Sequence, residues 1–269
     1  MKKAKKVAGW RFLGSAALFA GLLLGECPIL AQEWDKASGA NLLQQAVQAA
    51  QQDDSAAAVK TLTTLLKKEP KNSTAWYLRG RENFRLGRIE QSIQDFDRAV
   101  ELDPKSESRQ WERGIAYYYA GEYKKGARQF QDYQSYHDQD VENSAWRYLC
   151  VARSKGVEQA RSTLLPIEND PRIPMMRIYD LYAGKAQPAD VLRAARDGTS
   201  SSEALKARLF YAHLYIGLWF EAADDNEQAR EHILAAEKHR IGHYMWDVAH
   251  VHAERLRQKA KTAAEANRD

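Results

Sequence analysis

The feature that most constrains this chain is a recurrence of residue types every 34 positions in its first half. Four pairs share that spacing: Gly80 with Gly114, Gly87 with Gly121, Phe96 with Phe130, and Pro70 with Pro104. A fixed period of this length is typical of repeat architectures, in which each short unit buries its apolar face against the next unit. The sequence therefore predicts stacked structural repeats.

Within one period, residues 73–106, the pattern predicts two helices joined by a turn. Gly87 can adopt the left-handed conformation that ends a helix, and Pro104 cannot continue one. Between them, apolar residues recur at the spacing of one helical face: Ile89, Ile93, Phe96 and Val100. Gly80 lets the two helices approach closely. We therefore expect an all-α fold of helix-turn-helix hairpins.

This pattern resembles the tetratricopeptide repeat (TPR) family. The matching residues in segment 73–106 are Trp76, Gly80, Gly87, Phe96, Ala99 and Pro104. Segment 107–140 carries the same pattern, and segment 39–72 carries it more weakly. The resemblance implies three TPR-like repeats over residues 39–140, arranged as an α-solenoid.

The rest of the chain predicts further helices with a less regular pattern. We expect residues 141–203 to form a degenerate helical region, because residues 164–190 hold four of the seven prolines. Residues 204–257 predict a C-terminal TPR-like hairpin with a capping helix, followed by a polar tail at residues 258–269. Within that capping helix, His243–Ala249 is dense in large side chains. We favour a hydrophobic cap for this segment over a partner-binding patch.

The N-terminus predicts export. Residues 1–11 hold five Lys and Arg, and the next 14 residues form an apolar run that is short for a membrane span. We expect residues 1–31 to be a signal peptide that is removed after Ala31, and residues 32–38 to be a linker. Lipidation at Cys27 and an uncleaved anchor are the alternatives. The protein is then periplasmic or secreted, and it contacts a membrane only through a retained or lipidated N-terminus.

Export also changes the charge of the chain. The first 31 residues hold five of the 40 Lys and Arg and one of the 36 Asp and Glu. The mature chain therefore carries 35 basic and 35 acidic residues. It lacks the basic excess that nucleic-acid binding requires, so nucleic acid is not an expected partner.

The sequence contains no recognisable catalytic motif, since GxSxG, HExxH, CxxC and a glycine-rich phosphate loop are all missing from it. We therefore expect no enzyme activity and no cofactor. His239 and His243 have the spacing of a metal pair on a helix, but we favour packing and capping roles and predict no metal site. Cys150 follows Trp146 by one helical turn, and we expect a buried thiol.

The resemblance places a protein-binding groove on the concave side of the hairpins, along their first helices. The residues at the family's groove positions are Tyr77, Arg81, Phe84, Arg85, Trp111, Ile115, Tyr118 and Tyr119. Aromatic residues and arginine are enriched at binding hot spots. Arg81 and Arg85, four residues apart on one helix, could grip a carboxylate of a protein or peptide partner. The alternative for each aromatic residue is packing between repeats.

The order of parts also resembles the NlpI family of periplasmic TPR lipoproteins, most specifically in segment 113–121. The resemblance implies a homodimeric adaptor that brings peptidoglycan hydrolases to a protease. We therefore expect an exported, non-enzymatic scaffold that binds other proteins and acts in the cell envelope. The alternative is a structural subunit of an envelope, secretion or outer-membrane complex that acts through self-association.

Overall fold

The computed structural model describes residues 28–198 and 201–266 of the chain. The described part of the chain divides into two units after Ser38. The expected signal peptide, residues 1–31, lies almost entirely outside the described residues. The expected linker, residues 32–38, is helical, because α1 begins at Pro28 and continues through it.

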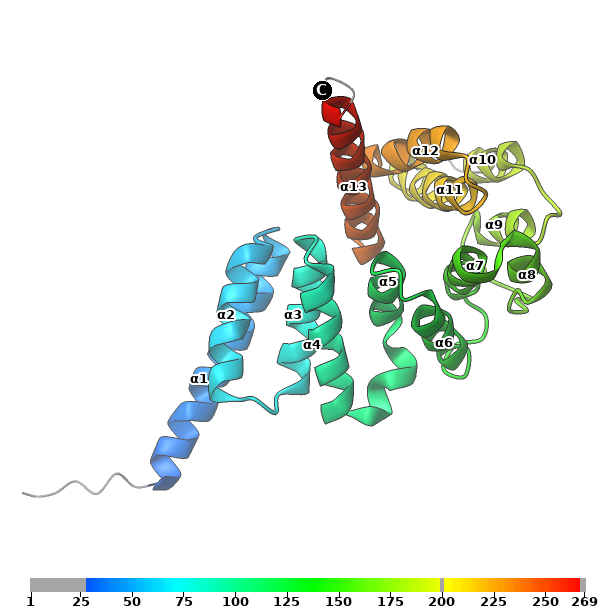
Figure 1. Cartoon of the computed structure of the whole chain (residues 1–269). Helices are drawn as coiled ribbons and strands as arrows, with labels where there is room; N and C mark the ends of the chain where they lie inside the picture. Colours follow the sequence, from blue (N-terminus) through cyan, green and yellow to red (C-terminus); the bar gives the residue numbers. More distant parts are fainter. Residues whose placement is uncertain (1–27, 199–200, 267–269) are drawn as a thin grey trace, which may run out of the picture. The chain divides into compact units, whose positions relative to one another are not determined.

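The described residues form helices and no strands, which confirms the all-α prediction (Figure 1). The first three hairpins comprise α1 (Pro28–Gln51), α2 (Ser55–Lys68), α3 (Ser73–Arg85), α4 (Ile89–Leu102), a 3-10 turn (Pro104–Arg109), α5 (Trp111–Tyr119) and α6 (Tyr123–Tyr133). The remaining helices are α7 (Val141–Lys155), α8 (Val157–Ser162), α9 (Met175–Tyr182), α10 (Pro188–Arg196), α11 (Ser202–Ala222), α12 (Asn226–Lys238) and α13 (Tyr244–Ala266). None of the described helices is long and apolar enough to span a membrane.

The glycines and prolines of the 34-residue period define the hairpins as expected. Gly87 and Gly121 follow α3 and α5 with φ angles of +70° and +77°, a conformation that costs glycine little. Gly114 lies directly beneath the ring of Phe130, so that a Cβ atom at this position would be 2.7 Å from the ring. The period therefore reflects two needs, a left-handed turn and a close approach of helices.

The region expected to be degenerate, residues 141–203, is packed as firmly as the repeats around it. Helix α7 contacts α6, α8, α9 and α11. Tyr148, Tyr182 and Tyr215 are fully buried in a row of edge-on rings, and the Tyr182 hydroxyl donates a hydrogen bond to the Tyr215 carbonyl at 2.9 Å. Packing is thus continuous from α5 to α12 despite the prolines.

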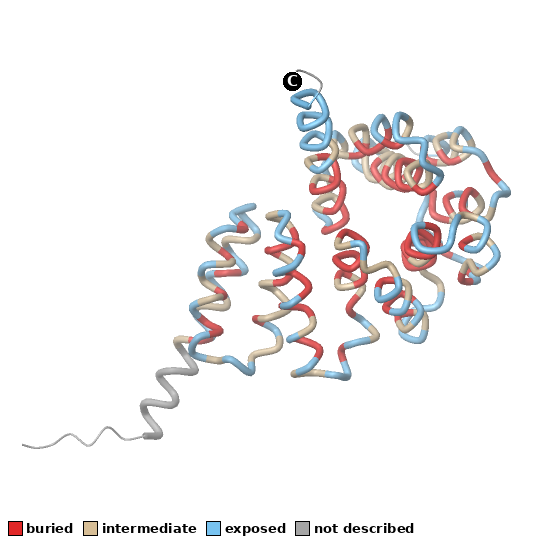
Figure 2. The backbone as a smooth tube through the Cα atoms, in the orientation of Figure 1, coloured by how far each residue is buried: buried red, intermediate tan, exposed pale blue. Residues whose placement is uncertain are grey.

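Helix α13 contacts α12 and also α3, which is far away in the sequence. Its first half is buried and its second half is exposed, as Figure 2 shows. One large hydrophobic cluster runs from Phe84 in α3 to Ala253 in α13, so these two helices share a core, whereas α1, α2 and the start of α3 form a smaller cluster of their own. The expected polar tail needs a correction: residues 258–266 are exposed but continue α13 as helix.

The Gly114–Phe130 contact generates a stability prediction. We expect Gly114→Ala to lower the free energy of unfolding by about 1–3 kcal/mol, because the added methyl group forces a buried aromatic ring to move. The matched control is Gly242→Ala, where no atom lies within 4 Å of the new Cβ, and we expect a change within about 0.5 kcal/mol. Urea denaturation followed by circular dichroism measures both values. Equal effects of the two substitutions would contradict the close-approach role.

Candidate functional site

The predicted groove is partly filled by the same chain. The beginning of α13 lies against the concave face formed by α3 and α5. Arg85 Nε donates a hydrogen bond to Asp247 Oδ2 at 2.8 Å, and Arg85 Nη1 donates to Glu82 Oε1 at 2.9 Å. The carboxylate that Arg85 was expected to bind in a partner is therefore supplied by α13 itself.

Tyr244 is the main aromatic contact of this junction. Its side chain is almost fully buried, and its ring lies 5.8 Å from the ring of Phe84 and 5.6 Å from that of Trp111. The Arg81 guanidinium carbon lies 4.7 Å from the centre of the Tyr244 ring, within cation–π range. The dense segment His243–Ala249 was expected to cap the last hairpin. Helix α13 does contact α12 of that hairpin, and the segment also packs against α3 and α5 of the second and third repeats.

The next turns of α13 extend the contact along α5. The Tyr119 hydroxyl and His252 Nδ1 are 2.9 Å apart, and the Tyr118 hydroxyl donates to Glu221 of α11 at 3.0 Å. Burial raises the pKa of both tyrosines far above the ordinary value and lowers the pKa of His252. These groups are neutral at physiological pH, so they serve packing and orientation.

The eight predicted groove residues therefore separate into two sets. Four are buried in the core: Phe84, Ile115, Tyr118 and Tyr119, of which Tyr118 and Tyr119 also line a hollow of about 670 Å³. Their burial favours the alternative of packing between helices. The other four are only partly buried: Tyr77, Arg81, Arg85 and Trp111. Their role in binding stays a prediction.

Arg81 differs from Arg85 in that it forms no short ion pair. Its nearest acid is Glu112, with 3.7 Å between Arg81 Nε and Glu112 Oε1, and that oxygen already accepts a hydrogen bond from the Tyr77 hydroxyl at 2.6 Å. Among the described residues, Arg81 Nε has no hydrogen-bond partner. Burial raises the pKa of Glu112, which weakens its value as a counter-ion at this position.

Three neighbouring hollows of about 250, 330 and 460 Å³ surround Arg85 on one side of α13. We call this surface the Arg81–Arg85 cleft. The 460 Å³ hollow is lined by more cationic than anionic side chains, namely Arg81, Arg85, Lys206 and Arg240 against Asp53 and Asp247. A further hollow of about 670 Å³ lies beside Arg85 and the more C-terminal turns of α13. The start of α13 therefore narrows the concave face without closing it.

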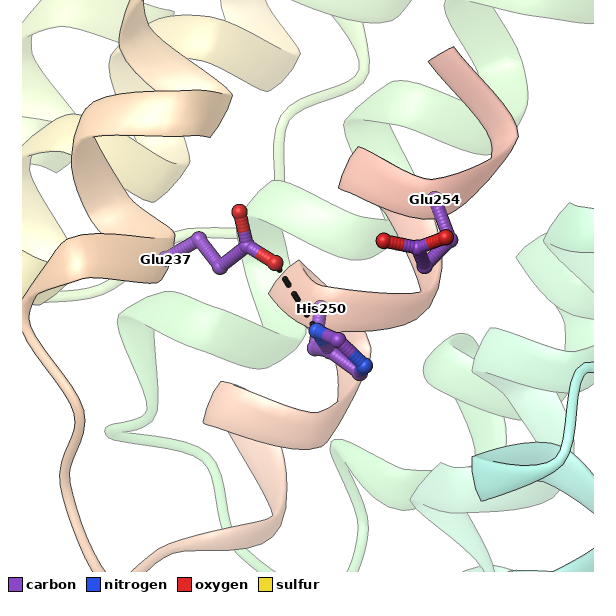
Figure 3. Close-up of side chains that lie close together, drawn as sticks. All are labelled: Glu237, His250 and Glu254. Atoms are coloured by element: carbon purple, nitrogen blue, oxygen red, sulfur yellow. Dashed lines mark hydrogen bonds and ion pairs between the residues drawn. The ribbon is translucent and has the colours of Figure 1, made fainter. Parts of the chain in front are cut away.

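One group of described side chains has the composition of a metal site, Glu237, His250 and Glu254 (Figure 3). Glu237 Oε1 lies 2.8 Å from His250 Nδ1. Arg257 donates hydrogen bonds to both acids, including one of 2.5 Å to Glu254 Oε1. Although burial alone would raise the pKa of Glu237, hydrogen bonds from Arg257 and His250 lower it. The guanidinium supplies the positive charge that a metal ion would bring, so we interpret this group as an ion-pair network.

The histidines expected to be structural lie in two separate places. His243 stacks on Trp111, with 6.4 Å between ring centres, whereas His239 stacks on His213. His213 Nδ1 and His232 Nδ1 are 3.0 Å apart and form a hydrogen bond in which one ring donates and the other accepts. Sequence spacing did not reveal this pair, because its members come from two different helices.

Cys150 is fully buried, as expected, and it is unpaired. Burial raises the pKa of its thiol well above the ordinary value. A protonated and inaccessible thiol is a poor nucleophile. Its sulfur packs near Gly126, where a Cβ atom would come within 2.8 Å of it.

Comparison with known proteins supports the repeat prediction for part of the chain. The family model described as tetratricopeptide repeat matches residues 43–107. Among curated proteins, none matches the sequence of this chain. The likeness to the NlpI family stays a prediction.

Among solved structures, the TPR protein YrrB shares 15% identity over 86% of this chain and 99% of its own, with a TM-score of 0.45. The type IV pilus biogenesis factor PilW shares 14% identity over 75% of this chain and 93% of its own, with a TM-score of 0.45. A TPR protein from Parabacteroides merdae shares 15% identity over 79% of this chain and 97% of its own, with a TM-score of 0.46.

The histidine pair generates a pH prediction. Burial, together with His232 and His239, lowers the pKa of His213 to about 4. In the unfolded chain His213 is protonated below about pH 6.5, whereas in the folded chain it is protonated only near pH 4. The contribution of His213 to the free energy of unfolding is therefore complete above about pH 6.5 and is lost as the pH falls towards 4. We expect His213→Gln to reduce the loss of unfolding free energy over this interval, measured by urea denaturation at several pH values. The same pH dependence in both proteins would contradict this assignment.

Proposed function

We propose that this chain is an exported, non-catalytic adaptor of the tetratricopeptide repeat class, whose members bind protein or peptide partners, and that it holds a partner protein in the Arg81–Arg85 cleft. The observation that carries the proposal is the set of adjoining hollows around Arg85 on the concave face of the repeats. Repeat proteins use such concave surfaces to bind extended partners.

The partner binds beside α13 and does not replace it. Tyr244, Met245 and Val248 are each at most 3% exposed. Removing three such side chains from the core costs on the order of 5 kcal/mol in lost burial alone, which is a large part of the stability of a typical domain. The start of α13 is therefore a fixed wall of the cleft.

The charge of the cleft favours an acidic partner segment. Arg85 is already bound to Asp247 and Glu82, so it orients the wall and contributes little free positive charge. Arg81 Nε makes no hydrogen bond and has only the long ion pair with Glu112, and Lys206 adds a further cation to the lining. A carboxylate of the partner that reaches Arg81 would gain a charge-assisted hydrogen bond in a partly desolvated site.

The N-terminal sequence supports export of this adaptor. A basic start followed by an apolar run and a small residue at Ala31 is typical of a cleaved signal. The near-neutral mature chain and the resemblance to the NlpI family favour a role in the cell envelope, in which the partner is a peptidoglycan hydrolase or another envelope enzyme.

The cleft generates a binding prediction. We expect Arg81→Gln to reduce capture of the partner roughly tenfold, because one charge-assisted hydrogen bond is lost while the shape of the cleft is kept. Affinity capture from an envelope extract, quantified by mass spectrometry, measures the effect. Arg98→Gln on α4 is the matched control, because Arg98 pairs only with Glu101 in its own helix among the contacts described. Equal recovery of every captured protein by both variants would overturn the assignment of the cleft.

Export generates a separate prediction. We expect the protein purified from its native host to begin at Gln32, as measured by mass spectrometry of the intact chain, and to fractionate outside the cytoplasm. A chain lipidated at Cys27 would have a larger mass with a diacylglycerol group, and an unprocessed cytoplasmic chain would contradict export.

A further inference from the structure

A separate cavity of about 240 Å³ lies between α5, α6, α7 and the start of α13. Most of its wall is aromatic or apolar and is formed by Trp111, Phe130, Tyr133, Trp146 and Met245. Its volume is smaller than the roughly 300–1,000 Å³ of pockets that hold drug-sized ligands. The cavity therefore has room for a single extended side chain. We call it the Trp111–Trp146 cavity.

The charged lining of this cavity has a surplus of acid. Asp140 and Glu142 line it together with one cation, Arg172. Arg172 binds Glu142 Oε1 at 2.6 Å and Asp140 Oδ1 at 2.7 Å, and it also binds Asp170. One guanidinium group is therefore the counter-ion of three carboxylates. The lining has three further ionisable groups. His137 is exposed, the pKa of His243 is lowered by burial and by Arg81, and the pKa of Tyr133 is raised by burial, so that its hydroxyl is neutral.

The electrostatics of Glu142 show that Arg172 does not balance this surplus. Burial, reinforced by Asp140, raises the pKa of Glu142 to about 7, although Arg172 and the Tyr215 hydroxyl oppose the shift. A carboxyl group that is fully compensated by a cation would titrate below its ordinary value. The site therefore gains free energy if a second positive charge enters it.

Asn143 adds an acceptor that lacks a donor. Its side chain is 3% exposed and lines the cavity. Asn143 Nδ2 donates to the Phe130 carbonyl at 3.0 Å and to Gln134 Oε1 at 3.0 Å, which fixes the orientation of the amide. Within residues 28–198 and 201–266, no donor reaches Asn143 Oδ1. A buried acceptor without a partner is costly, so a guest that donates a hydrogen bond is favoured.

We propose that the Trp111–Trp146 cavity binds a lysine side chain of a partner protein. The four methylene groups of lysine match the aromatic wall, and the ammonium group supplies both the missing positive charge and a donor for Asn143 Oδ1. The aromatic rings add cation–π attraction. An apolar guest would leave Asn143 Oδ1 unpaired, and an anionic guest would face the carboxylates of Asp140 and Glu142.

The site shares only Trp111 and His243 with the lining of the Arg81–Arg85 cleft, so it is tested with a small probe on the full chain. Nα-acetyl-lysine N-methylamide is titrated into ¹⁵N-labelled protein, and the indole N–H resonances are followed by NMR. Trp146 Nε1 has no hydrogen-bond partner among the described residues and is therefore a sensitive reporter. Its resonance is assigned with Trp146→Phe, and that of Trp111 with Trp111→Phe. We expect saturable shifts of both resonances and no shift of Trp76.

The matched probe is Nα-acetyl-norleucine N-methylamide, which keeps a linear apolar side chain and lacks the ammonium group. We expect it to bind at least about tenfold more weakly than the lysine probe, because it brings neither the charge nor the hydrogen bond. Equal affinity of the two probes would overturn the proposal in favour of a purely apolar pocket. Shifts that do not saturate, or that are the same at all indoles, would also overturn it.

Variants of the acidic residues complete the test. Asp140→Asn and Glu142→Gln keep the shape of the lining and remove one charge each, and we expect each to weaken lysine binding roughly tenfold. Asparagine can still accept the hydrogen bond that Glu142 N donates to Asp140 at the start of α7, so Asp140→Asn decides the outcome if Glu142→Gln does not fold. The control is the exposed neighbour Asp138, where Asp138→Asn should leave binding unchanged. Full binding by Asp140→Asn would overturn the role of the acidic surplus.

Discussion

The structure depends on the contact between the first turn of α13 and the concave face of α3 and α5. Arg85 and Asp247 are 162 residues apart and are joined by a 2.8 Å hydrogen bond, while Tyr244 is buried between Phe84 and Trp111. A row of helical hairpins stacks through nearest neighbours alone. This contact adds a long-range constraint, and through it the first and last helices of the large hydrophobic cluster share one core.

The same turn of α13 forms part of each candidate binding surface. Asp247 and Tyr244 line the Arg81–Arg85 cleft, Met245 lines the Trp111–Trp146 cavity, and His243 lines both. The cleft has a surplus of cations and the cavity a surplus of carboxylates, although the mature sequence is close to neutral. A partner with an acidic segment and a suitably placed lysine would satisfy both, and opposite charges at two positions would fix its direction of binding.

Part of the predicted groove is buried in the core because other helices of the same chain reach it. The resemblance to the TPR family places Tyr118 and Tyr119 on the inner face of the first helices. Whether an inner face meets a partner or the same chain depends on what else reaches it. Here His252 and Glu221, from α13 and α11, bind the two tyrosine hydroxyls, so the aromatic residues stabilise the fold.

The sequence by itself determined the helical hairpins, because Gly87, Gly121, Gly114 and Phe130 act through local geometry: a left-handed turn, or a close approach between adjacent helices. It also determined which side chains are large and apolar, including the dense segment at His243–Ala249. Only the tertiary structure decided that this segment packs against α3 and α5, and that Asp140 and Glu142 share one cation with Asp170. The physical reason is that these contacts join distant segments through side-chain shape and charge, which leave no periodic trace in the sequence.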